Sequence, residues 1–167
     1  MSGSRCRRDG NGRVLFAHRD RRRAITVFEI GLPDGAKRFA TGGTRSLFAL
    51  RAGTARDLRA LVVAEGAVNA LSLAQIDRCH VHSACLSTAG APSKSQREQI
   101  GLAARLLPNL EAVILAQDND EAGERQAETL RARVKIPPRV AFQRCRPPEN
   151  ADWNDIVNPA RTGRRPR

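Results

Sequence analysis

The chain contains no tyrosine, and its aromatic content is only 4 %. Without tyrosine it cannot carry an active site that attacks DNA through a tyrosine hydroxyl, which excludes a topoisomerase centre on this chain. The scarcity of aromatic side chains also predicts a core built from aliphatic ones, namely leucine, valine, isoleucine and alanine.

Cysteines and long apolar runs are scarce as well. The cysteines form no Cys-x-x-Cys pair, so we expect neither a zinc ribbon nor a disulfide framework; they are Cys6, Cys79, Cys85 and Cys145. No apolar run reaches the roughly 18 residues of a membrane helix, and the N-terminal residues lack the apolar stretch of a secretory signal. These absences favour a reduced, cytoplasmic setting without a membrane partner.

Positive charge is plentiful but unevenly distributed. The formal net charge is +12, yet residues 61–130 hold more acidic than basic side chains, between basic flanks at 1–60 and 131–167. Basic flanks can neutralise phosphates and release counterions, which indicates nucleic-acid binding. An arginine-rich composition imposed by GC-rich DNA would also explain the total charge, but it would not spare the centre of the chain.

Turn signals divide the chain into segments. Residues 1–12 and 159–167 are expected to be disordered basic tails. Residues 13–57 hold short apolar runs separated by Pro-Asp-Gly and Gly-Gly turns, which predicts a small strand-rich N-terminal segment. In residues 58–158, apolar runs alternate with helical patterns, which predicts an α/β domain.

The alternation in that domain predicts a mainly parallel four-stranded sheet flanked by helices. The expected strands are residues 61–64, 84–87, 112–116 and 140–145, and the expected helices are 67–76, 95–107 and 121–134. A capping box, Ser95-x-x-Glu98, is expected to start the second helix.

Acidic residues follow two of these strands. Glu65 comes directly after the first, and Asp118 and Asp120 come after the third. Ligands of open parallel sheets bind beyond the carboxyl ends of the strands, so the three carboxylates converge if the two strands are neighbours. Converging carboxylates repel one another unless a cation lies among them, and hard oxygen ligands select Mg²⁺ or Mn²⁺. Such an ion can polarise a phosphoryl oxygen.

Spacing alone leaves a structural alternative open. Acidic residues between a strand and a helix are often plain N-caps, and Asp120 stands directly before the helix expected at Glu121. Glu65, before Gly66, can equally be an exposed turn residue. The presence of acids at both strand ends favours a shared site over two unrelated turns.

Two segments of the chain resemble the motifs of the toprim family. Leu61-Val-Val-Ala-Glu65-Gly66 is similar to the first motif, an apolar strand ending in Glu-Gly before a helix. Val113-Ile-Leu-Ala-Gln-Asp118-Asn-Asp120-Glu-Ala-Gly123 is similar to the second, an apolar strand ending in Asp-x-Asp-x-x-Gly. Leu86–Gly90 resembles the loop between them, and Asp152-Trp-Asn-Asp155 resembles a late segment of primase-like members.

The resemblance implies a Rossmann-like toprim sheet that binds Mg²⁺ (or Mn²⁺) through the motif acids. Glu65 would serve as a general acid or base or as a metal ligand, and Asp118 and Asp120 would be metal ligands. Asn69 stands one helical turn after Glu65, where many primase-like members have an acid, and this weakens a second metal site. Asp152 and Asp155 are secondary site candidates.

The family includes bacterial primases, topoisomerases and small nucleases. The leading hypothesis is a Mg²⁺-dependent, primase-like nucleotidyltransferase domain that acts in DNA replication or in mobilisation of a plasmid or other mobile element. Its expected partners are single-stranded DNA or RNA, nucleoside triphosphates and other replication or mobilisation proteins. The alternatives are a small toprim-fold nuclease and a non-catalytic DNA-binding accessory protein.

Several basic residues outside the motifs are candidates for contacting nucleic acid. They are Arg21, Arg22 and Arg23, in an expected hairpin turn, and Lys94, just before a helix N-terminus, where anions bind readily. His80-Val81-His82 has the spacing of relaxase metal sites, but a surface loop is the favoured interpretation. Trp153 is expected to pack against the domain edge rather than stack on a base.

Overall fold

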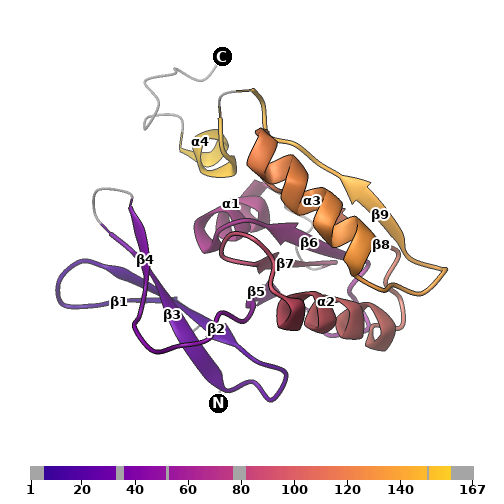
Figure 1. The fold of residues 1–167 in the computed structure, drawn as a ribbon, viewed down its shortest axis with the longest axis horizontal. Helices are drawn as coiled ribbons and strands as arrows, with labels where there is room; N and C mark the ends of the chain where they lie inside the picture. Colours follow the sequence, from indigo (N-terminus) through magenta and orange to yellow (C-terminus); the bar gives the residue numbers. More distant parts are fainter. Residues whose placement is uncertain (1–5, 33–35, 52, 77–81, 150, 159–167) are drawn as a thin grey trace.

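The computed structural model describes residues 6–32, 36–51, 53–76, 82–149 and 151–158, and these form two sheets with four helices (Figure 1). The N-terminal sheet is antiparallel, in the order β1-β2-β3-β4. Its strands are β1 (Cys6–Arg8), β2 (Val14–Arg19), β3 (Ile25–Gly31) and β4 (Lys37–Phe39). The strand-rich N-terminal segment is thus present.

Part of the expected N-terminal tail is ordered. Cys6–Arg8 pairs with Val14–Phe16 across the turn at Asn11-Gly12, so the expectation of disorder over residues 1–12 is wrong for this stretch. Gly12 has a φ of +74°, a conformation that glycine adopts without steric cost.

The second sheet has the order β5-β7-β6-β8-β9. Its strands are β5 (Phe48–Arg51), β6 (Ala60–Ala64), β7 (Ser83–Ser87), β8 (Ala112–Leu115) and β9 (Ala141–Arg144). Strands β7, β6, β8 and β9 run parallel, which confirms the mainly parallel α/β sheet. Antiparallel β5 is an additional edge strand, contributed by the segment before residue 58.

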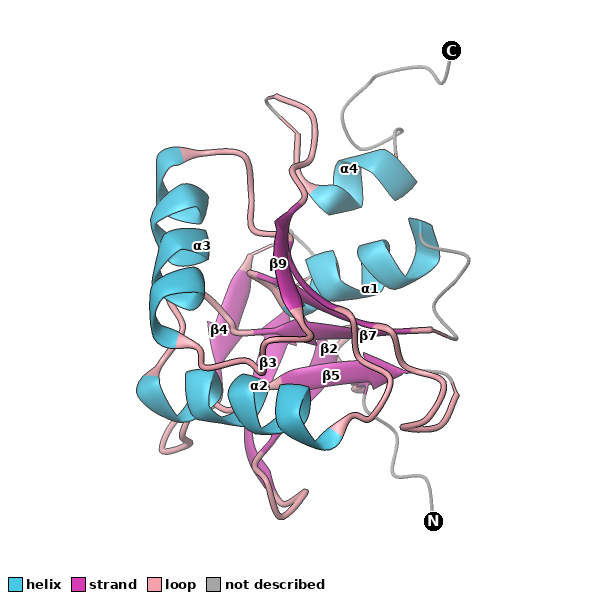
Figure 2. Ribbon diagram, turned by 90° about the vertical axis from the view of Figure 1, so that its right-hand side faces the viewer, coloured by secondary structure: helices cyan, strands magenta, loops and turns pink. Residues whose placement is uncertain are grey.

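Helices cover both faces of this sheet (Figure 2). They are α1 (Ala67–Ile76), α2 (Lys94–Leu106), α3 (Glu121–Arg133) and α4 (Trp153–Val157). The central strand β6 is buried on both sides: Leu61 and Val63 join the core with α2 and α3, whereas Val62 and Ala64 join the core with α1 and α4. A strand buried on both faces reads as a continuous apolar run, as this one does.

The N-terminal sheet packs into the core on the α1 side. Phe16 of β2 and Phe48 of β5 meet edge to face, with ring centroids 5.6 Å apart. The two sheets therefore share buried side chains. None of the helices in the described part of the chain is long and apolar enough to cross a membrane.

Helix α2 begins earlier than the sequence pattern indicates. Its N-cap is Ser93, which forms a capping box with Gln96 rather than the expected Ser95–Glu98 box. The Gln96 amide nitrogen donates to Ser93 Oγ at 3.2 Å, and the Ser93 amide donates to Gln96 Oε1 at 2.8 Å. Both pairs have the required spacing, and the extended backbone of Ser93 decides between them.

Candidate metal and nucleic-acid site

The two motif strands are neighbours, as the convergence of the acids requires. Strands β6 and β8 pair in parallel, with Val63 opposite Leu115, so their carboxyl ends stop at one edge of the sheet. Glu65 leaves β6 at this edge, and Asp118 and Asp120 leave β8 there. Trp153 donates its indole N–H to the Ala116 carbonyl at 2.8 Å and is buried, which confirms its packing role.

The acids at this edge act on one another electrostatically. Burial, and after it the negative charges of Glu65, Asp152 and Asp120 in that order, together raise the pKa of Asp118 from 3.8 to about 6. The ammonium group of Lys37 opposes this shift. A crowded carboxylate of this kind is stabilised in its charged form by a nearby cation.

Each motif acid also has a contact within the protein. Glu65 Oε1 lies 3.5 Å from Lys37 Nζ, and Glu65 Oε2 accepts a hydrogen bond from Gln126 at 3.1 Å. Asn69 Nδ2 donates to Asp118 Oδ1 at 2.8 Å, so the amide that replaces the expected acid binds a motif carboxylate directly.

Asp120 is the N-cap of α3. Its Oδ1 accepts a hydrogen bond from the Gly123 backbone N–H at 2.7 Å. The N-cap role, which the sequence left open as an alternative for Asp120, is therefore present in the structure. The cap uses one of its two carboxylate oxygens, and a carboxylate has lone pairs for further ligation. Capping and metal binding are therefore compatible for this residue.

The chemistry of the donors fits Mg²⁺ or Mn²⁺, but the side chains are not arranged as a finished site. Within the described ranges, no three His, Cys, Asp or Glu side chains are grouped so as to hold a metal ion. Next to Glu65, however, Gln126 Oε1 is buried and has no hydrogen-bond partner in the described part of the chain. A cation carrying water ligands would satisfy this oxygen and relieve the crowding at Asp118. The shared divalent site of Glu65, Asp118 and Asp120 stays a prediction.

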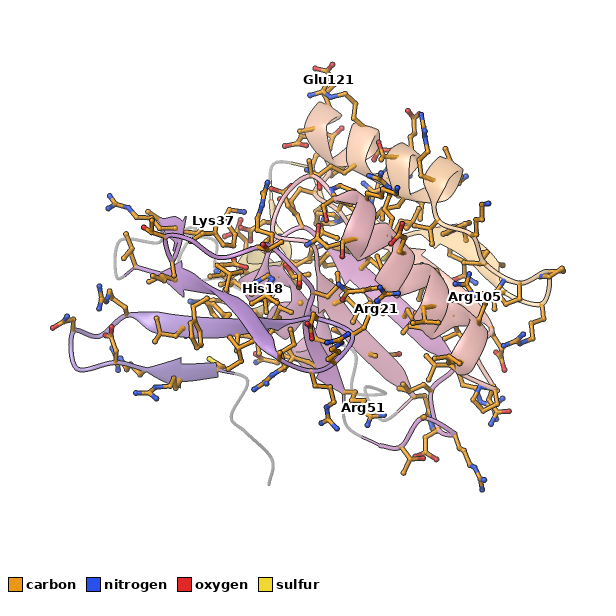
Figure 3. All side chains as sticks on the ribbon, turned by 60° about the horizontal axis from the view of Figure 1, so that its bottom comes forward. His18, Arg21, Lys37, Arg51, Arg105 and Glu121 are labelled. Carbon is orange, nitrogen blue, oxygen red and sulfur yellow. The ribbon has the colours of Figure 1, made fainter. Side chains whose placement is uncertain are left out.

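A cleft of about 800 Å³ lies between the two sheets, and of the three motif acids Asp118 lines it. Its N-terminal wall includes Arg8 and Lys37, and its opposite wall includes Asn69, Asp118 and Asp152. Lys37 stands on β4 of the N-terminal sheet (Figure 3). A cationic wall facing an acidic one suits a metal-bound polyphosphate or a nucleic-acid backbone.

Arg144, which the sequence analysis did not single out, holds the backbone of the second motif in place through hydrogen bonds. From β9 it donates to the carbonyls of Asp118 at 3.0 Å, Gln117 at 2.9 Å and Leu115 at 3.0 Å. It also pairs with Glu124 at 2.6 Å, and hydrogen bonds from Arg146 and Arg144 lower the pKa of Glu124 to about 2. The sequence carries no signal for this role, because the contacts to residues 115–118 are made through backbone carbonyls.

Gly123 of the second motif allows α3 to approach the Asp118 loop. A Cβ atom at this position would lie 2.1 Å from the Asp118 carbonyl oxygen. We expect Gly123→Ala to lower the free energy of unfolding by about 1–3 kcal/mol, because backbone must move to admit the methyl group. Urea denaturation measures this effect, with Gly10→Ala as the control, since no heavy atom lies within 4 Å of a Cβ there. Equal midpoints for the two variants would contradict the close-approach role.

The remaining candidates divide between structural and surface positions. Asp152 and Asp155 form the capping box of α4, with Asp152 Oδ1 accepting the Asp155 amide at 2.8 Å. Asp152 nevertheless lines the cleft and acts on Asp118, whereas Asp155 is engaged in the cap. His80 and Cys79 lie outside the described residues, and His82 contacts the Asp57 carbonyl at 3.1 Å.

The arginine cluster lies away from the acidic cleft. Arg21 and Arg22 form the turn between β2 and β3, as expected, and Arg23 follows with a φ of 67°. Arg21 and Lys94 line a groove of about 550 Å³ along α2, near Arg105 (Figure 3). Its basic lining comprises Arg21, Lys94, Arg97, Arg105, Arg133 and Lys135. We call this set the α2 groove.

A family model described as toprim-like matches residues 62–157. No curated protein matches the chain. Among solved structures, the primase fragment of the bacteriophage T7 primase-helicase is 20 % identical, with a TM-score of 0.59, and the match covers 91 % of this chain and 60 % of that one.

Two bacterial primase structures are similar as well. The DnaG primase catalytic domain bound to single-stranded DNA is 17 % identical, with a TM-score of 0.60, covering 93 % of this chain and 54 % of that one. The E. coli primase catalytic core is 17 % identical, with a TM-score of 0.58, covering 93 % and 53 %. The chain thus spans between half and two thirds of the length of these three structures.

Proposed function

Since the chain belongs to the toprim-like family, we propose that it is a Mg²⁺-dependent nucleic-acid phosphoryl-transfer domain of primase-like type, acting in DNA replication or in mobilisation of a plasmid or other mobile element. The observation that carries this proposal is the placement of Glu65, Asp118 and Asp120 at one sheet edge. The fold likeness to primase structures supports it.

The motif acids and the residues that line the cleft would have different roles in phosphoryl transfer. Glu65, Asp118 and Asp120 would hold the ion, which when bound polarises a phosphoryl oxygen and orients attacking and leaving oxygens. Lys37 and Arg8, on the facing wall, would neutralise the phosphates that the acids repel. Arg144 and Asn69 keep Asp118 directed toward the cleft through its carbonyl and carboxylate oxygens.

The test offers the chain single-stranded DNA, nucleoside triphosphates and Mg²⁺, and compares the lengths of substrate and product. New oligonucleotides made from the nucleoside triphosphates, or products longer than the DNA supplied, support the primase-like function, and shortened DNA supports the toprim-fold nuclease. Both activities should vanish with EDTA and in Glu65→Gln. A chain that binds DNA equally well with and without Mg²⁺, and changes its length in neither direction, is the non-catalytic binder.

Binding of single-stranded nucleic acid should depend steeply on salt and should weaken when Arg21, Arg22 and Arg23 become alanine. The motif acids repel phosphates when no metal is bound, so basic surfaces must attract the polyanion. Each phosphate contact contributes about 0.7 to the slope of log K against log salt for single strands, so losing three contacts flattens the slope by about 2. Fluorescence anisotropy over a salt series measures the slope.

The control for this experiment removes equal charge elsewhere. Arg51 lies on β5 and Arg56 and Arg59 precede β6, and none of the three lines the α2 groove. In their triple alanine variant, the slope of log K against log salt should differ from that of wild type by less than the change of about 0.7 expected for one contact. Equal slopes in the two triple variants would show that the Arg21–Arg23 cluster reflects overall composition alone.

A further inference from the structure

The N-terminal sheet contains a buried pair of polar side chains that the proposed chemistry does not use. His18 of β2 is 0 % exposed and Glu29 of β3 is 1 % exposed. His18 Nε2 lies 3.1 Å from Glu29 Oε2, and the rings of Phe39 and Phe48 pack around the imidazole. Two ionisable groups removed from water are costly to maintain unless their hydrogen bonds are complete.

The remaining polar atoms of the pair reach out of the N-terminal sheet. His18 Nδ1 donates to the Ser46 carbonyl at 2.8 Å. The same oxygen also accepts a hydrogen bond from the side-chain amide (Nε2) of Gln96, on α2, at 2.8 Å. On the other side, Glu29 Oε1 accepts the backbone N–H of Ala67 at 3.3 Å. The hydrogen bonds therefore run from α2, through the pair, to α1.

Ala67 is the first residue of α1 and directly follows Glu65 and Gly66. The preceding glycine has no side chain to cap the helix, and α1 has no acidic residue in its first turn. Glu29 thus supplies, from a distant strand, the carboxylate that a helix N-terminus normally receives from its own N-cap. A Cβ atom built on Gly66 would lie 3.8 Å from Glu29 Oε1, which places the carboxylate beside this loop.

The other end of the Glu65 loop is also fixed. Ser87 Oγ and the Gly90 amide both donate to the Glu65 carbonyl, each at 3.0 Å. With Glu29 holding Ala67, the backbone is held on both sides of Glu65, which leaves its side chain to Lys37 and Gln126. Outer hydrogen-bond partners of this kind orient metal-ligating side chains and tune their affinity.

We propose that Glu29, supported by His18, is a positioning residue that sets the conformation of the Glu65–Gly66 loop, so that the N-terminal sheet forms part of the catalytic unit. The inference rests on the proposed function only in taking Glu65 as a metal ligand. Glu29 itself touches neither the ion nor the substrate.

The experiment compares Glu29→Ala, Glu29→Gln and Val27→Ala in the full chain. Val27 is a buried residue of the same strand without a polar role, so its variant controls for weakening of the N-terminal sheet. Two NMR readouts need no metal: hydrogen exchange of the Ala67 amide, and the nuclear Overhauser effect between Glu65 Hγ and the Gln126 side-chain amide. The third readout is Mn²⁺ affinity by electron paramagnetic resonance.

In Glu29→Ala we expect exchange at Ala67 to quicken about tenfold or more, the Glu65–Gln126 signal to disappear, and Mn²⁺ affinity to fall about tenfold. Glu29→Gln, whose amide oxygen still accepts from Ala67, should show smaller changes in the same direction, and it carries the test where the alanine variant does not fold. Val27→Ala should keep the Glu65–Gln126 signal and wild-type Mn²⁺ affinity.

An unchanged Glu65–Gln126 signal in folded Glu29 variants would overturn the proposal, as would equal losses in Val27→Ala. Quickened exchange at Ala67 with unchanged Mn²⁺ affinity would also overturn it, because Glu65 would then not depend on the contact. If the wild-type chain binds no Mn²⁺, the proposed function fails, and the two NMR readouts alone decide whether Glu29 positions the loop.

Discussion

Replacing Asp118 by asparagine should abolish Mg²⁺-dependent activity and yet raise the free energy of unfolding of the metal-free protein at pH 7. The variant loses a charged ligand, so we expect activity to fall about a hundredfold or more. It keeps the shape of the side chain and an oxygen that can still accept from Asn69. The repulsion from Glu65, Asp152 and Asp120 disappears with the charge.

The sign of this stability effect follows from the raised pKa. Because the folded-state pKa of Asp118 is about 6 and its ordinary value is 3.8, the folded protein holds the proton more tightly than the unfolded chain does. Stability from that proton is complete below about pH 4 and is lost as the pH rises through 6. Allowing for partial solvent screening, the loss is about 1–2 kcal/mol, and Asp118→Asn should escape it.

Urea denaturation between pH 4 and 8, in EDTA, measures this difference. Wild type should lose stability relative to Asp118→Asn between pH 4 and 6, and the difference should be constant above pH 7. Glu111→Gln is the control, since that carboxylate is exposed and pairs with Arg59 at a different edge. Near-normal turnover of Asp118→Asn would show that Asp118 is not a ligand. If the free energies of unfolding of wild type and Asp118→Asn changed in parallel with pH, repulsion at Asp118 would not affect stability.

Arg144→Ala should cause the largest loss of stability among the site variants, about 3–5 kcal/mol, because it removes the guanidinium group that donates to several largely buried oxygens at once. The Arg144 side chain is 8 % exposed and donates to three carbonyls of the 115–118 segment as well as to Glu124. Without it, those oxygens are left without these bonds in the interior.

Arg146→Ala is the matched control, because Arg146 binds the same Glu124 carboxylate from a half-exposed position. We expect its urea midpoint to stay near that of wild type. Arg144→Lys should fall between the two, since an ammonium group keeps the charge but cannot reproduce the guanidinium fork. Similar midpoints for Arg144→Ala and Arg146→Ala would show that the carbonyl contacts contribute little.

The placement of the acids could be predicted because a simple rule governs parallel sheets. Apolar runs at 61–64 and 112–116 mark buried strands, and residues that follow such strands must emerge at one sheet edge. The boundaries of α1 at Ala67–Ile76 were predictable for the same reason, since the Glu65-Gly66 turn fixes its start.

The partners of those acids could not be predicted, because they come from distant parts of the chain. Lys37 and Glu29 belong to the N-terminal sheet, and their contacts with Glu65 and Ala67 depend on how two sheets pack. Arg144 acts through backbone carbonyls, which leave no trace in the side-chain pattern. Strand β5 joins its sheet through pairing with β7, more than 30 residues along the chain, which local periodicity does not encode.

Binding of Mn²⁺, followed by electron paramagnetic resonance, tests the central claim most directly because it does not depend on the identity of the substrate. The wild-type chain should bind Mn²⁺ competitively with Mg²⁺, and Glu65→Gln, Asp118→Asn and Asp120→Asn should each weaken binding, whereas Glu111→Gln should not. Absence of binding in the wild type, or affinities unchanged by all three substitutions, would contradict a shared divalent site at this sheet edge.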